Sequence, residues 1–113
     1  MAIEKLSQRD QQVIAECLDA ILSGVFIDDV EFQITAGVTF AEVARVRAAL
    51  PDVDDSLETV ALVINGVLNG LLGYPHRQEA RWADFISVPT TEVSLIFRRW
   101  REARGWTSDG QGE

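Results

Sequence analysis

The segment Leu57–Leu72 constrains the fold of this chain more than any other. Its apolar residues recur at helical spacing and occupy almost the whole circumference of the predicted helix. Such a helix is stable only where other parts of the protein cover it, because its apolar sides would otherwise face water. Asn65, Gly66, Asn69 and Gly70 interrupt the run, which falls short of the ~20 apolar residues that span a bilayer. We therefore predict a central buried helix and no membrane segment.

Capping and turn residues divide the rest of the chain into amphipathic helices. Segment 30–34 also alternates like a strand, but a single strand would leave its backbone groups unpaired, so we expect a helix there. Thr39 and Glu42 have the spacing of a capping box. The sequence predicts an all-α, compact single-domain bundle of five to six helices over residues 1–106, with a disordered C-terminal tail at 107–113. The helices are expected from Ser7 to Gly24, from 28 to 36, from Thr39 to Pro51, from Leu57 to Leu72, from 80 to 86 and from Pro89 to Gly105.

The two halves of the chain share a pattern of residues. Gly24 and Gly73 are 49 positions apart, and one inserted residue brings the other matches into register. Two interpretations stay open: two pseudo-repeated three-helix units around the central helix, or a chance coincidence of apolar residues. The pairs 50 positions apart are Phe32 and Trp82, Val38 and Val88, Glu42 and Glu92, and Val43 and Val93.

The net charge of the chain narrows the classes of molecule that it could bind. The 113 residues hold 18 acidic and 10 basic side chains, which gives a net charge of −8. A surface of that sign repels nucleic acid and anionic membranes at long range. Cys17 is the one cysteine, so a disulfide within the chain is excluded. No leader segment is visible at the N-terminus, and we expect a cytoplasmic protein.

We predict no catalytic, cofactor-binding or metal-binding residues. His76 is the one histidine and is expected in a surface turn, and Cys17 lies on the apolar stripe of the first helix. The acidic clusters at 28–31 and 52–58 precede helices, where carboxylates cap N-termini, although two or three of them could also hold a hard cation. Loops that bind phosphates and zinc-protease motifs are absent from the sequence.

Basic residues crowd the last predicted helix around a tryptophan. This pattern indicates a surface for an acidic partner, whereas the structural alternative is that cations favour a helix C-terminus. The predicted partner-binding residues are Arg98, Trp100, Arg101, Arg104 and Trp106.

The helix pair at 31–50 offers a second hypothesis. A short helix, a turn at Gly37 and a capped amphipathic helix resemble a DNA-binding helix-turn-helix, with Thr39, Arg45 and Arg47 as the residues toward DNA. Gln33 departs from that pattern, and the negative net charge opposes phosphate binding. A third hypothesis is a homodimer that packs through Gly66 and Gly70.

Three stretches resemble small uncharacterised bacterial proteins of similar length: Val30–Gln33, Leu71–His76 and Trp82–Pro89. The resemblance covers most of the chain from Gly24 to Trp100 and implies a one-domain bacterial protein, without implying an activity. The leading hypothesis is therefore a small acidic, non-enzymatic protein-interaction module of the adaptor, antitoxin or immunity type. It would bind another protein without a cofactor, and nucleic-acid binding is the alternative.

Overall fold

The computed structural model describes residues 2–105, and all regular structure in that part of the chain is helical. This confirms the all-α bundle. Its extents of 31, 28 and 27 Å are nearly equal, so the helices form one compact globule. None of these helices is both long and apolar enough to cross a membrane. The elements are the 3-10 helix η1 (Ile3–Lys5), α1 (Gln8–Leu22), α2 (Asp29–Ala36), α3 (Phe40–Ala49), α4 (Glu58–Gly73), the 3-10 helix η2 (Glu79–Arg81), α5 (Trp82–Phe85) and α6 (Thr90–Ala103).

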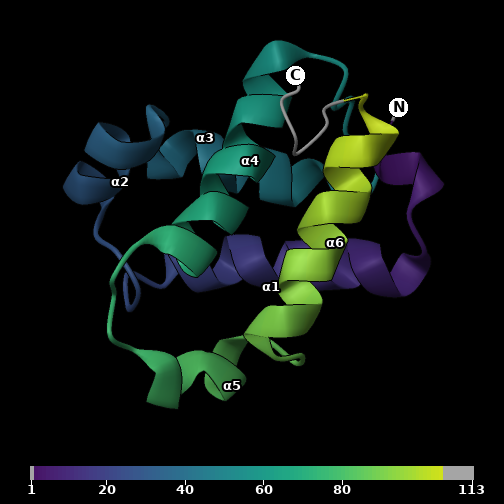
Figure 1. Cartoon of the computed structure of the whole chain (residues 1–113). Helices are drawn as coiled ribbons and strands as arrows, with labels where there is room; N and C mark the ends of the chain where they lie inside the picture. The colour runs from purple at the N-terminus through teal and green to yellow at the C-terminus, as the bar shows by residue number, and fades with distance from the viewer. Residues whose placement is uncertain (1, 106–113) are drawn as a thin grey trace.

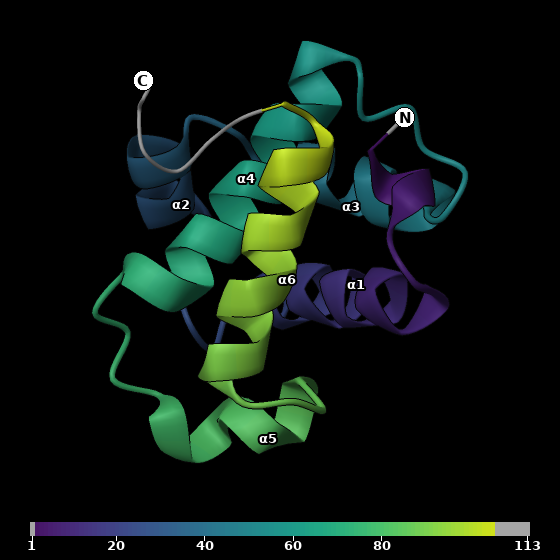
Figure 2. The same cartoon turned by 45° about the vertical axis from the view of Figure 1, so that its right-hand side comes forward.

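Helix α4 is the centre of the bundle. It contacts α1, α2, α3 and α6, and it lies between α2 and α6 in both views (Figures 1 and 2). Ile64, Val67 and Leu68 are fully buried. The prediction of a central buried helix at Leu57–Leu72 is confirmed, and its cause is the apolar circumference that requires cover on every side.

The helix starts follow from local capping. Ser7, Asp28 and Thr39 each accept a hydrogen bond from a backbone N–H three residues later, at 2.8–3.1 Å. Glu42 completes the predicted capping box by accepting from the Thr39 N–H at 2.8 Å. The Asp29 carboxylate reaches from α2 to the Phe40 N–H at 3.0 Å and so fixes α3 against α2. The carboxylates of Asp28 and Asp29 thus stabilise helix N-termini, which is the role predicted for the acidic cluster at 28–31.

The helices form two three-helix units with the same register. Helices α4 and α6 begin 50 positions after α1 and α3, and η2, which leads into α5, begins 50 positions after α2. Identical core residues recur at the same offset, and both members of each pair are buried. The predicted repeat is therefore present in the fold. These pairs are Val13 and Val63, Ile14 and Ile64, Leu18 and Leu68, Val38 and Val88, and Val43 and Val93.

The two units exchange their short helices. Helix α2 of the first unit packs on α4 of the second, and α5 of the second unit packs on α1 of the first. Phe26 and His76 occupy equivalent positions and touch edge to face, with ring centroids 4.9 Å apart. Contact between equivalent residues is what a pseudo-two-fold relation produces on its axis. The core is consequently shared between the units.

Candidate functional site

Part of the basic side of α6 is used in contacts within the protein. Arg99 binds Asp10 of α1 in a bidentate pair, at 2.8 and 3.0 Å, and lies 3.6 Å from Glu92. The hydrogen bonds that Arg99 donates to the Asp10 carboxylate raise the pKa of Arg99 above its ordinary value. Arg99 thus joins α6 to α1.

Trp100 is not a surface residue, contrary to the prediction. Its ring is fully buried, and its Nε1 donates to Asp55 Oδ2 at 2.8 Å. The Asp55 carboxylate also accepts from the N–H groups of Ala2 and Ile3, at 3.0 and 2.9 Å. Arg104 donates to the Asp55 carbonyl oxygen and lies over the Trp100 ring. Trp100 and Arg104, two of the five predicted partner-binding residues, therefore serve a structural network that joins η1, the loop before α4 and α6.

Arg98 and Arg101 remain as basic residues that could meet a partner. Neither takes part in an ion pair within residues 2–105. Arg98 is exposed, and the guanidinium of Arg101 lies 5.4 Å from the Phe97 ring centroid. Leu95, which is 44% exposed, lies one turn before Arg98. Trp106 lies outside the described residues.

A short helix, a glycine turn and a capped helix are present at α2 and α3, but two of the three predicted DNA-binding residues have other roles. Gly37 ends α2 with φ of +77°, a conformation that favours glycine. The Thr39 side chain belongs to the capping box, and Arg47 Nε binds Asp19 at 2.9 Å. Arg45 is exposed on α3 and is the predicted residue that stays available.

The groups best able to act in catalysis are held in structural contacts. The His76 side chain is 5% exposed, which corrects the predicted surface turn. Its Nδ1 accepts from the Gln78 N–H at 2.9 Å, so its Nε2 carries the proton and donates to the Leu71 carbonyl at 3.1 Å. Burial raises the pKa of Cys17 well above its ordinary range, as expected for a core thiol.

The second acidic cluster does not act as a simple helix cap. Asp54 accepts from the backbone and the hydroxyl of Ser56, and these bonds lower the pKa of Asp54. Asp55 turns inward to Trp100, and Leu57, without a capping side chain, occupies the N-cap of α4. Within residues 2–105, no three His, Cys, Asp or Glu side chains are grouped so that they could hold a metal ion.

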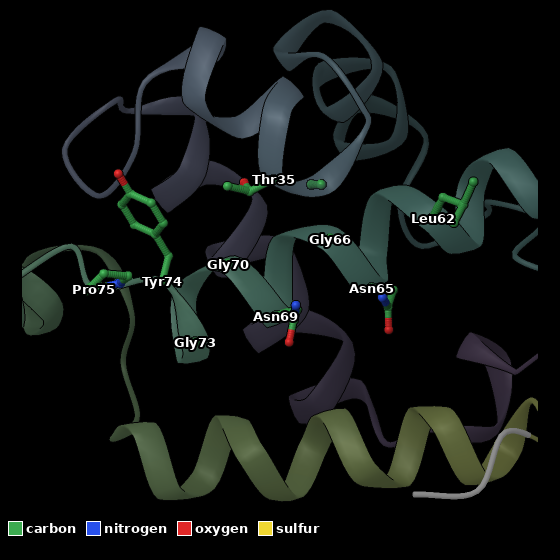
Figure 3. Close-up of a pocket in the computed structure, with 10 residues that line it drawn as sticks. Thr35, Leu62, Asn65, Gly66, Asn69, Gly70, Gly73, Tyr74 and Pro75 are labelled. Atoms are coloured by element: carbon green, nitrogen blue, oxygen red, sulfur yellow. The ribbon is translucent and has the colours of Figure 1, made fainter. Parts of the chain in front are cut away.

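A groove of about 350 Å³ runs along α4 beside α2, and we call it the α4 groove. It contains Asn65 and Asn69, which point to the same side of α4, the side along which α6 runs (Figure 3). The sequence indicated these two amides, but the residues that α2 and the turn after α4 bring to them depend on tertiary packing. The lining residues are Thr35, Ala36, Leu62, Asn65, Gly66, Asn69, Gly70, Gly73, Tyr74 and Pro75.

Gly66 lies where α2 packs tightly against α4. A Cβ at this position would be 3.0 Å from the Ala36 Cβ, whereas one at Gly70 would meet Phe32 at an ordinary 3.7 Å. The glycine pattern predicted a close neighbour, and α2 of the same chain is that neighbour for Gly66. Helix α2 therefore already covers Gly66. This glycine is not available for the homodimer contact that the third hypothesis places at Gly66 and Gly70.

The equivalent positions in the first unit are used differently. Asp19, equivalent to Asn69, pairs with Arg47 of α3 at 2.9 Å. Glu16, equivalent to Gly66, accepts two hydrogen bonds from the loop before α6, at 2.9 and 2.8 Å. In α1 these positions hold charged side chains that bind neighbouring elements, and in α4 they hold an amide and a glycine that border a groove.

Helix α2 bears the most exposed apolar side chains. Val30 and Ile34 are 67% and 72% exposed and lie one turn apart. Their equivalents in the second unit are Ala80 and Asp84, so the repeat itself does not require apolar residues there.

Comparison of the chain with protein-family models, with curated proteins and with solved structures finds no match.

Proposed function

We propose that this chain is a small protein-interaction module that binds another protein and catalyses no reaction. The buried, hydrogen-bonded state of His76 and the burial of Cys17 support a binding role, because neither group is placed to accept a proton from a substrate or attack one. The bacterial origin, the cytoplasmic location and the adaptor, antitoxin or immunity type belong to this proposal.

The contact surface that we propose is the side of α6 that carries the exposed residues Leu95 and Arg98 and the half-buried Arg101. The carrying observation is that Arg98 and Arg101 have no ion pair within the described residues, although acidic side chains outnumber basic ones in the chain. Protein interfaces are enriched in arginine, and Leu95 adds exposed apolar surface beside Arg98. A partner with an acidic surface would complement this side of α6.

The test is affinity capture from a lysate of the organism that encodes the chain, with and without nuclease. The baits are the wild type, the double variant R98E/R101E and the control R45E, which reverses one exposed charge on α3. A protein partner that survives nuclease, is lost with R98E/R101E and is retained with R45E would support the proposal. Equal capture by the double variant and the wild type would contradict the α6 surface. Nucleic acid that is captured by the wild type and lost with R45E would favour the helix-turn-helix alternative.

A further inference from the structure

We propose that the α4 groove binds an extended peptide segment through its backbone, with Asn65 and Asn69 as the recognising side chains. The inference rests on the proposed role in protein interaction, but it concerns a different surface from α6. It names the chemistry of the ligand, which is a neutral, extended main chain.

The two side-chain amides are available to a ligand. The side chains of Asn65 and Asn69 make no hydrogen bond within residues 2–105, and both residues line the groove. A primary amide presents a donor and an acceptor side by side. The N–H and C=O groups of one residue in an extended chain point to the same edge, so one asparagine can bind both.

The spacing of the two amides matches the repeat of an extended chain. They are four residues apart on α4, which corresponds to about 6 Å along the helix axis. Alternate residues of an extended chain are about 6.6 Å apart and expose the same backbone edge. Asn65 and Asn69 can therefore bind residues i and i+2 of one peptide, as a neighbouring strand would.

The rest of the groove suits a main chain better than a charged ligand. None of the lining residues has a formal charge, so a phosphate or a metal ion would find no counter-charge there. Gly70 and Gly73 place no side chain between α4 and a ligand, which lets a backbone approach closely. Leu62 and Pro75 supply apolar contacts near the two ends of the groove.

The repeat provides an internal comparison. Asp19, equivalent to Asn69, is neutralised by Arg47, and Glu16, equivalent to Gly66, is hydrogen-bonded to Ser87. The fold is thus stable with polar contacts at these places in one unit, while the other unit leaves its amide without a partner. Asn69 is exposed and its side chain makes no hydrogen bond within residues 2–105, so a ligand can reach its amide.

The experiment uses the whole chain and a phage-displayed library of random eight-residue peptides. Selected peptides are synthesised, and their affinities are measured by fluorescence anisotropy against the wild type, N65A/N69A and the control Q33A. Gln33 is an exposed amide on α2 outside the groove. We expect N65A/N69A to weaken binding about tenfold or more, because several hydrogen bonds are lost, and Q33A to leave it unchanged. Circular dichroism verifies that both variants keep the helical fold.

A second measurement separates backbone recognition from side-chain recognition. Peptides N-methylated at single positions should lose affinity at two positions, i and i+2, and keep it at the position between them. Equal binding to the wild type and N65A/N69A, or affinity that is insensitive to every N-methyl group, would overturn the proposal. An absence of enriched peptides would overturn it as well. R98E/R101E should leave peptide affinity unchanged, so the α6 proposal can fail or stand independently of this one.

Discussion

At the scale of single residues, Asp55 is a fully buried carboxylate that holds three parts of the fold together. Its buried carboxylate accepts hydrogen bonds from Ala2, Ile3 and Trp100 and joins segments 45–53 positions apart. Removing it would leave buried N–H donors without an acceptor, and each such donor costs about 1–3 kcal/mol. We expect D55A to lower the free energy of unfolding by about 3–5 kcal/mol, measured by urea denaturation. D52A, which removes the same group from an exposed position, should cost under ~0.5 kcal/mol, and similar losses for both would contradict the network.

Residues of this kind could not be predicted from the sequence. Asp55 stands in an acidic run before a helix, and acidic side chains are seldom fully buried, so a capping role was the natural interpretation. Its partners lie far away in the chain. The burial of His76 could not be predicted either. The rings of Phe26 and Trp82 pack against it, and both come from other segments of the chain. The burial of Cys17, by contrast, followed from its place on an apolar stripe.

At the scale of elements, prediction from sequence succeeded because the signals are local. The N-caps at Ser7, Asp28 and Thr39, and the turn at Gly37, all lie within a few residues of the helix ends that they define. The short η1 was missed, since its stability depends on the distant Asp55. Of the α4 groove, the sequence indicates only the two asparagines. The other sides of the groove come from α2 and the turn after α4, and their position depends on tertiary packing.

The two glycines of α4 allow a matched test of helix packing. Alanine favours a helix over glycine by about 1 kcal/mol. G70A should therefore raise the free energy of unfolding by about 0.5–1 kcal/mol, because a Cβ there meets Phe32 at a comfortable 3.7 Å. G66A should be less stable than G70A by about 1 kcal/mol or more, since its Cβ would press on Ala36 at 3.0 Å. If urea denaturation gives the same increase in unfolding free energy for both variants, then α2 can shift away from position 66 at little cost.

The burial of α4 has its own test. L68A removes a fully buried side chain and should cost about 2–5 kcal/mol of unfolding free energy. L62A makes the same chemical change on the same helix at a residue that is 43% exposed, and it should cost clearly less, about 1 kcal/mol. Comparable costs for the two variants would mean that α4 is not enclosed on the Leu68 side.

At the scale of the whole molecule, the exchange of short helices decides how the protein unfolds. Because α2 covers α4 and α5 covers α1, neither three-helix unit has a complete core of its own. The chain should therefore unfold in one cooperative step despite its internal repeat. Two independently stable halves are the alternative, and they would give separate transitions.

The residues needed to distinguish these cases are already present. Cys17 lies buried in the first unit, whereas every tryptophan of the chain lies in the second half. Burial and the raised pKa of Cys17 should protect it from a thiol reagent such as dithiobisnitrobenzoate at pH 8 in the native state. As urea increases, the midpoint for exposure of Cys17 should coincide with the midpoint for tryptophan fluorescence. Midpoints that differ by more than the error of the fits would show that the units unfold separately, and then α2 and α5 would contribute little to the core that they cover.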